Sequence, residues 1–448
     1  MTERTRVPNK RLASLIGQEK WRNGEFARAV NKVAAEYGLT LRYDDSNVCH
    51  WLAGSKPRAY AQPAILEAFA RRLRRPVTFA EAGFAAPIGD ALRPGADTVA
   101  GLVELGSADM DPSRRAVLGV GLYSVAMAVP GWPDNTDRFT RLARDPHVRI
   151  GCHDVDAVVA MTDKISQIDD RFGGRTARPM AAAFLVNTIV PYLRADAPDD
   201  VRRAMLSAAA DHCYLTGYMA MDERADSLAQ QYYAKALELA LAAGDHLAYC
   251  TSLRGMSVQA VDLGHSSHSL HLAEAASSAS PQAGPRMRAF LAGQQAHAAA
   301  ATGDRGTALL KIRETEAAME KADSRPKAIG SYDESSLHYH IAQVRYALGD
   351  KSASIDDLAT SDRLRHSMYR RTRIRYLGTL AERKLELGRL DEACADWHRA
   401  LDDYPEVRSG RCDDRFNAMV SALRPHMRNP SARGLYERAR TMAPLSRA

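Results

Sequence analysis

LGRLDEACADWHRALDDYP, residues 387–405, is the stretch that decides the fold. Ala393, Trp397 and Ala400 follow one another in it at steps of four and three residues, which places them on one face of a helix. The small alanines let two antiparallel helices approach closely, while Trp397 fills the seam between neighbouring units. The stretch therefore predicts the second helix of a helix pair, entered through a turn at Gly388.

Weaker copies of this pattern extend toward the N-terminus. Their turn glycines are Gly264, Gly303, Gly349 and Gly388, at steps of 39, 46 and 39 residues. An earlier unit around Tyr233 has a turn near residues 221–224 that lacks glycine. The repeated unit resembles a tetratricopeptide repeat, whose period is about 34 residues, and the longer steps indicate extended helices. Five helix pairs are therefore expected over residues 200–405, as a tetratricopeptide-like α-solenoid.

A groove is the expected binding surface of this solenoid. A stack of helix pairs cannot close on itself in one layer, so we expect it to curve and to expose a concave face along the first helix of each pair. Arg254, Gln294 and Tyr339 lie on expected first helices and are candidates for that groove, although each would equally suit bulk solvent. Grooves of this kind bind peptides or proteins.

The excess of positive charge lies in the first fifth of the chain. The 448 residues carry a formal net charge of +7. Residues 1–93 hold 16 Lys and Arg against 9 Asp and Glu, which leaves 45 against 45 for the remainder. This distribution is expected when the first segment binds a polyanion and the rest does not, although a solvated basic surface would look the same.

Helical patterns in the basic segment predict a helix-turn-helix. After a scaffold helix from about Asn23, Asp44 or Asp45 can cap a short helix that Gly54 ends. Val48, Trp51 and Leu52 form its inward face, and its outward face is Ser46, Asn47, Cys49 and His50.

The outward face is the one we expect in the major groove of double-stranded DNA. The Asn47 amide suits an adenine edge, whereas Ser46 and His50 can each form single hydrogen bonds. Arg42, Lys56 and Arg58 flank the helix and would contact phosphates. The same residues would also suit an ordinary helix and turn with solvated side chains.

Residues 9–84 carry a family resemblance. They resemble actinobacterial helix-turn-helix regulators related to the XRE class, which often have tetratricopeptide-like C-terminal halves. The resemblance implies transcriptional control. It departs from the usual motif at residues 38–44, because the turn before the recognition helix is longer than three or four residues. The matching segments are Asn9–Ala13, Phe26–Asn31, Leu41–Asp44, Val48–Gly54 and Lys56–Arg58.

The rest of the chain divides at breaks in the helical pattern. A helix-turn-helix domain is expected over 1–84, a linker over 85–133, a helical region over 134–199 and the repeat domain over 200–440. The linker contains an apolar run at 116–129, which is shorter than the ~20 residues that span a bilayer, so we expect a buried helix there. Asp170–Gly174 is expected to separate two helices.

Enzymatic chemistry is not expected. The sequence has no G-x-S-x-G, phosphate-loop, G-x-G-x-x-G or H-E-x-x-H motif, and no cofactor is expected. His265, His268 and His271 span too much of a helix for one metal site without further ligands, so no metal is expected. The six cysteines are scattered, which favours a reducing cytoplasm over a disulfide framework.

The sequence thus predicts a cytoplasmic DNA-binding regulator that is homodimeric and contacts no membrane. Its array would dimerise, or bind a peptide, protein or small-molecule signal. An adaptor that acts only through protein contacts is the alternative, with the basic segment serving for solubility or docking.

Overall fold

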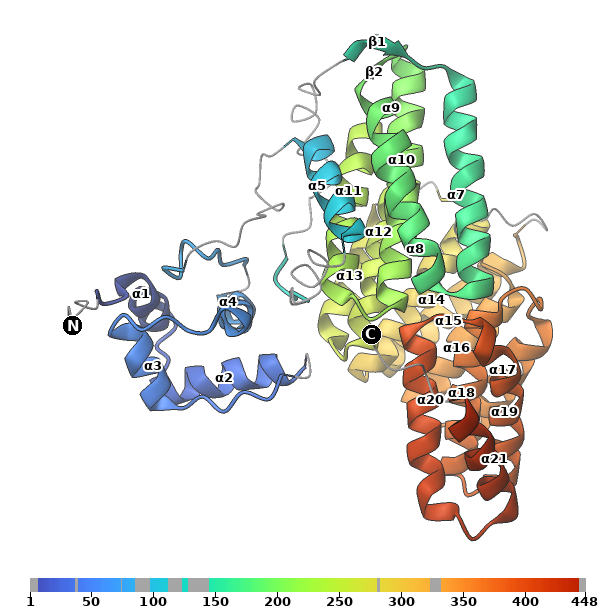
Figure 1. The fold of residues 1–448 in the computed structure, drawn as a ribbon. Coiled ribbons are helices and arrows are strands. Elements are labelled where there is room, and N and C mark those ends of the chain that lie inside the picture. Colours follow the sequence, from blue (N-terminus) through green and yellow to red (C-terminus); the bar gives the residue numbers. More distant parts are fainter. Residues whose placement is uncertain are drawn as a thin grey trace. The chain divides into compact units, whose positions relative to one another are not determined.

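The computed structural model describes residues 7–36, 39–73, 75–84, 97–111, 123–127, 145–279, 283–322 and 332–442 (Figure 1). The chain forms two compact units. The first, called the head, comprises Met1–Ala96 with Asp111–Pro130. The second, called the array, comprises Asp97–Met110 with Gly131–Ala448. Helices dominate both described units, which confirms the all-α fold class with a repeat-like array.

Four helices and a short turn form the described part of the head. Phe26 and Phe69 pack in its centre with ring centroids 4.5 Å apart, and Trp21 lies against both. Val48 from the third helix is fully buried in the same core. The elements are α1 (Lys10–Gln18), α2 (Asn23–Ala35), α3 (Asp45–Leu52), the 3-10 turn η1 (Ala59–Ala61) and α4 (Gln62–Leu73).

The segment expected to be a linker contains ordered structure. Helix α5 (Thr98–Met110) belongs to the array, where Thr98 Oγ1 donates to Glu238 and Tyr232 donates to Asp109 at 2.8 Å each. The apolar run 116–129 was expected to be a helix, but residues 123–127 form a turn in the head instead. The rest of that run lies outside the described residues.

The array begins with helices that precede the repeats. Gly173 separates α7 from α8, as expected from the sequence. The two short strands were not expected; they pair in parallel, with Asp145 opposite Ala195 and Arg149 opposite Asp196. These first elements are β1 (Asp145–Arg149), α7 (Cys152–Phe172), α8 (Gly174–Phe184), the π-helical turn η3 (Leu185–Ile189), α9 (Val190–Arg194) and β2 (Ala195–Asp196).

Helix pairs follow, and their turns confirm the glycine pattern. Gly264, Gly303, Gly349 and Gly388 all have positive φ, between 75° and 90°, which glycine adopts without strain from a Cβ. Where the first pair lacks a turn glycine, Arg224 takes φ 66° instead. The five pairs expected over 200–405 are α10 (Asp199–Asp222) with α11 (Asp226–Ala243), α12 (His246–Asp262) with α13 (Ser266–Ser278), α14 (Pro285–Thr302) with α15 (Arg305–Met319), α16 (Glu334–Ala347) with α17 (Lys351–Leu364), and α18 (Arg370–Glu386) with α19 (Leu390–Asp403).

The C-terminal helices bring the array back onto its own beginning. The Arg408 N–H donates to Phe172 O at 2.7 Å, and the Arg175 N–H donates to Arg408 O at 3.1 Å. Gly173 permits this approach, because a Cβ there would lie 2.4 Å from Arg408 O. The expectation of an open stack is therefore wrong for this array. The elements that complete it are η4 (Tyr404–Glu406), α20 (Gly410–Leu423), η5 (Arg424–His426) and α21 (Pro430–Thr441).

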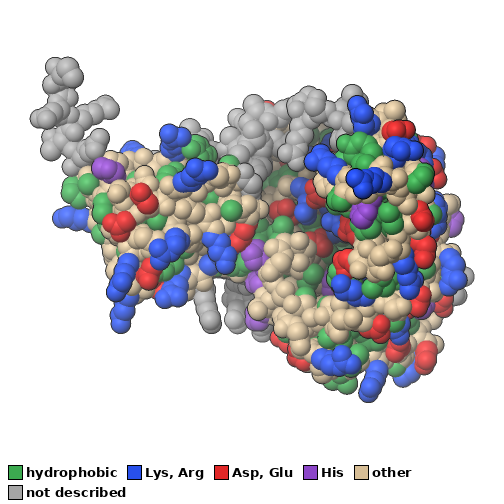
Figure 2. Space-filling view, turned by 90° about the horizontal axis from the view of Figure 1, so that it is seen from below, with side chains coloured by type: hydrophobic (Ala, Val, Ile, Leu, Met, Phe, Trp, Pro, Cys, Tyr) green, Lys and Arg blue, Asp and Glu red, His purple; other side chains and the backbone are tan. Residues whose placement is uncertain are grey.

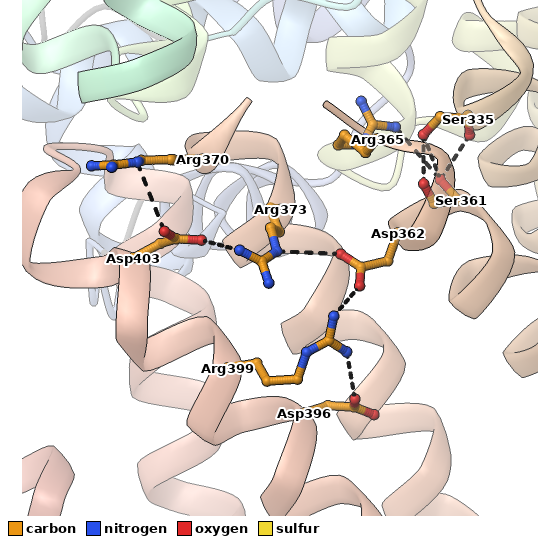
Figure 3. A network of polar contacts seen from close by, with 9 residues as sticks. All are labelled: Ser335, Ser361, Asp362, Arg365, Arg370, Arg373, Asp396, Arg399 and Asp403. Carbon is orange, nitrogen blue, oxygen red and sulfur yellow. Dashed lines mark hydrogen bonds and ion pairs between the residues drawn. The ribbon is translucent and has the colours of Figure 1, made fainter. Parts of the chain in front are cut away.

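Alternating charges join the last repeats. Arg373 contacts Asp403 at 3.1 Å and Asp362 at 3.6 Å, so it bridges α17, α18 and α19 (Figure 3). Arg399 extends the chain of contacts from Asp362 to Asp396. Each guanidinium in this ladder thus faces at least one carboxylate, which compensates its burial between helices.

None of the helices in the described segments combines the length and the apolar character that crossing a membrane requires.

Candidate nucleic-acid interface

Helix α3 is fixed at its start by a reciprocal cap. Asp44 Oδ1 accepts from the Asn47 N–H at 3.0 Å, and Asn47 Oδ1 accepts from the Asp44 N–H at 3.0 Å. Two of the backbone donors that a helix leaves unpaired are satisfied in this way. The expected cap at Asp44 is confirmed, and its geometry sets the direction in which α3 leaves the connector.

The scaffold helix α2 holds the connector that precedes α3. Asn31 donates from Nδ2 to Tyr43 O at 2.8 Å and accepts from the Tyr43 N–H at 3.0 Å. The Tyr43 ring then packs edge-on against Trp51, with centroids 4.8 Å apart. The connector is longer than in a compact helix-turn-helix, and these contacts hold its end against α2.

The end of α3 is anchored to the first helix of the head. The Asn9 N–H donates to Leu52 O at 2.9 Å. Gly54 has φ +99°, and a Cβ at this position would lie 2.2 Å from Val7 O. Glycine is therefore required here both by its conformation and by the close approach of the N-terminal segment.

Three of the four side chains predicted to face outward are exposed. Ser46, Cys49 and His50 are exposed, whereas Val48 and Trp51 are buried. The Cys49 thiol already has hydrogen-bond partners within the head: its Sγ accepts from Asn23 Nδ2 at 3.3 Å and donates to Asp45 at 3.7 Å. It thereby ties α3 to α2.

Asn47 is half-buried and differs from the expectation of a free amide. Its Oδ1 is engaged by the Asp44 N–H, while no hydrogen bond to another described residue occupies Nδ2. A two-point contact with adenine needs both the oxygen and the nitrogen of the amide. The cap therefore favours a single donated hydrogen bond from Nδ2.

The predicted phosphate contacts gather around one hollow. It has a volume of about 500 Å³, and its lining includes Arg42, Asn47, Lys56 and Arg58. The three cationic side chains are exposed. Among the described residues of the head, none of them forms an ion pair with a carboxylate; Arg58 donates to Tyr60 Oη at 3.0 Å. Lys and Arg side chains are prominent on the face of the head seen in Figure 2.

The arginines at the end of α4 are arranged differently. Arg71 pairs with Glu36 and Glu67, at 2.8 and 2.7 Å. The guanidinium groups of Arg72 and Arg75 pair with Glu19 and Glu81, at 3.2 and 2.8 Å, and Arg74 lies outside the described residues. The described arginines of α4 and the segment after it are thus compensated within the head, whereas Arg42, Lys56 and Arg58 beside α3 are not paired with any described carboxylate.

A segment that sequence reasoning missed completes the head. Residues 123–127, called the strap, follow α5 in the chain but pack on the head. The Val125 N–H donates to Glu67 Oε1 at 3.1 Å, and Ser124 also bonds Glu67. Burial raises the pKa of Glu67, and the hydrogen bonds from Ser124 and Arg71 oppose the rise. The sequence signal for such a partner is Glu67 itself, an acidic residue among the apolar residues of α4.

The three residues proposed for the groove do not share one environment. Gln294 is 1% exposed and donates to Ser257 Oγ at 3.0 Å, so it holds α14 against α12 and is not a groove residue. Tyr339 is half-buried and stacks on Tyr376, with centroids 4.1 Å apart. Arg254 is half-buried above the Phe290 ring. No group of His, Cys, Asp and Glu in the described segments could hold a metal ion.

Comparison with known proteins gives one partial match. A family model described as the SP15 N-terminal domain matches residues 12–85, which include most of α1 and all of α2, α3 and α4. No curated protein sequence matches the chain.

Proposed function

We propose that this protein is a cytoplasmic, sequence-specific DNA-binding transcriptional regulator. The observation that supports the proposal best is the outward face of α3 beside Arg42, Lys56 and Arg58, three exposed cations that form no ion pair with a described carboxylate. An α-helix with its side chains is about 10 to 12 Å across, which fits the width of the major groove. Ser46, Asn47 and His50 would face base edges, and the cations would contact the phosphates on either side.

The array would act as the dimerising or sensing part of the regulator. One short recognition helix seldom supplies enough specificity, so we propose a homodimer whose heads read half-sites about 34 to 36 Å apart, or a multiple of that distance. A peptide, protein or small-molecule signal bound by the array would then set how the paired heads are presented.

The proposal is tested with the full chain and DNA fragments selected from its own genome. Affinity should fall steeply with salt, with a log–log slope of about −0.9 for each phosphate contacted. Lys56→Gln should weaken binding to all sequences and make the slope shallower by about one. Arg75→Gln is the matched control. Because Arg75 is paired with Glu81, its substitution should leave the affinity for DNA unchanged.

Base reading is tested separately at Asn47. Asn47→Ala removes the oxygen that accepts from the Asp44 N–H together with the Nδ2 donor, whereas Asn47→Asp keeps an oxygen to accept from the Asp44 N–H and removes only the Nδ2 donor. We expect Asn47→Asp to fold and to lose about 1 to 3 kcal/mol of preference at one base position. An unchanged selected sequence would reject the base-reading role. Failure of the full chain to retain any DNA at low salt would favour the adaptor function instead.

A further inference from the structure

Side chains from four helices converge on Tyr218 inside the array. Tyr218 lies on α10, and the surrounding guanidinium groups belong to Arg254 of α12, Arg371 and Arg375 of α18, and Arg411 of α20. Burial opposes the ionisation of Tyr218, yet these four cations together lower its pKa below the usual value. Helices so far apart in the sequence reach one place only because the array returns to its own beginning.

The carboxylates near this cluster are unevenly shared. Arg371 contacts Asp169 and Asp170 at 3.0 Å and Asp222 at 3.5 Å. Arg411 pairs with Asp262. In contrast, neither Arg254 nor Arg375 forms an ion pair within the described part of the array. Every acid of the cluster is thus engaged by another arginine, and two cations remain uncompensated.

Several hydrogen-bonding groups of the cluster also have no partner. Nε of Arg254 and Nη1 of Arg411 are buried without an acceptor among the described residues. The Tyr218 hydroxyl forms no hydrogen bond with any described residue. Arg254 is held in place nonetheless, because it donates to Tyr214 and its Cζ lies 3.9 Å from the Phe290 ring centroid. Donors that are fixed in position but lack an acceptor are suited to an anionic ligand.

The ladder of Figure 3 shows how this array compensates arginines that serve packing. There Arg370, Arg373 and Arg399 each contact one or two carboxylates, whereas Arg365 bonds Ser361 Oγ. Arg254 and Arg375 are half-buried and lack such a carboxylate among the described residues, which leaves their charge available to an anion. Figure 2 shows the array hollowed, with Lys, Arg, Asp and Glu side chains visible in the hollow.

We propose that the interior of the array binds the oxyanion of a small molecule, a phosphate or a carboxylate, between Arg254, Arg375 and Arg411. The Tyr218 hydroxyl donates a further hydrogen bond to the same group. Guanidinium groups suit this role because their planar fork donates two parallel hydrogen bonds to either oxyanion. This anion would be the small-molecule signal of the sensing role proposed for the array.

Calorimetric titration of the full chain with inorganic phosphate, and separately with citrate, tests the site at constant ionic strength and without DNA. We expect saturable binding of at least one of them, and the better ligand tells a phosphate from a carboxylate. Arg375→Gln and Arg254→Gln should each weaken it about tenfold or more, since each removes a charged donor. Arg433→Gln, at an exposed arginine of α21, should bind as the parent does.

The melting temperature of each variant without ligand separates binding from folding. Arg375→Gln should melt at the parent temperature or above it, because it removes an uncompensated charge. Absence of binding by both anions would overturn the proposal, and so would equal affinities of Arg375→Gln, Arg254→Gln and the parent. Because no DNA is present, failure here leaves the DNA-binding proposal standing, and failure of DNA binding leaves this site standing.

Discussion

Substitution of Gly173 by Ala should open the array where its two ends meet. Gly173 has φ +89° and ψ 162°, a conformation that is essentially restricted to glycine and would cost an alanine about 1 to 3 kcal/mol. The new Cβ would also lie 2.4 Å from Arg408 O and 2.7 Å from Arg408 C. Both are backbone atoms, so the chain must move apart there.

The expected loss of stability follows from the hydrogen bonds that this movement breaks. The two hydrogen bonds between Arg408 and the backbone of Phe172 and Arg175 contribute about 1 kcal/mol each. Together with the backbone strain, Gly173→Ala should destabilise the array by about 3 to 5 kcal/mol. Gly388→Ala is the matched control, because Gly388 has φ +75° but nothing within 4 Å of its would-be Cβ. It should cost only about 1 kcal/mol.

Hydrogen exchange of the full chain gives a local readout of this difference. Amides of residues 173–177 and 408–413 should lose protection in Gly173→Ala and keep it in Gly388→Ala, while urea unfolding measures the two free energies. If both variants lose the same stability and the amides near Arg408 stay protected, the contact between the two ends of the array contributes nothing, and the reasoning is refuted.

Two further predictions concern buried ionisable groups. Burial lowers the pKa of His212 and His297 to about 4, against about 6.5 in the unfolded chain, so their contribution to stability is complete above pH 6.5 and falls as the pH drops toward 4. Between pH 7 and pH 5 this should remove about 2 kcal/mol for each histidine, measured by urea unfolding across pH; a flat profile would contradict it. Arg71→Met should destabilise the head by about 2 kcal/mol at pH 7, since it leaves the Glu67 carboxylate buried with fewer partners. The loss should shrink at acid pH as Glu67 protonates, and Arg71→Met with Glu67→Gln should be more stable than Arg71→Met alone.

The repeats of the array could be predicted because each depends on local chemistry. A turn with positive φ favours glycine wherever it occurs, so Gly264, Gly303, Gly349 and Gly388 mark helix ends without any knowledge of the tertiary fold. The outward face of α3 was predictable for the same reason, since Val48 and Trp51 define the buried side. Asp44 marked its start because short polar side chains cap helices.

Features that depend on distant contacts were missed. Arg408 contacts Phe172 because the combined curvature of five helix pairs brings them together. No local sequence pattern predicts that combined curvature. The strap was missed because Val125 reaches Glu67 across 58 residues of sequence, beyond a helix that belongs to the other unit. Gln294 was assigned to the groove because its helix was identified correctly but its direction was not.

Arginine illustrates why sequence alone could not separate structural from functional positions. Arg71, Arg373 and Arg375 all lie on helices, but the first two contact carboxylates and the third contacts none in the described structure. An arginine that is compensated within the fold resists replacement because a buried acid depends on it, as Glu67 depends on Arg71. An uncompensated arginine should instead be replaceable without loss of stability, and only its ligand would reveal the change. The same distinction separates Lys56 and Arg58 from Arg72 and Arg75 in the head.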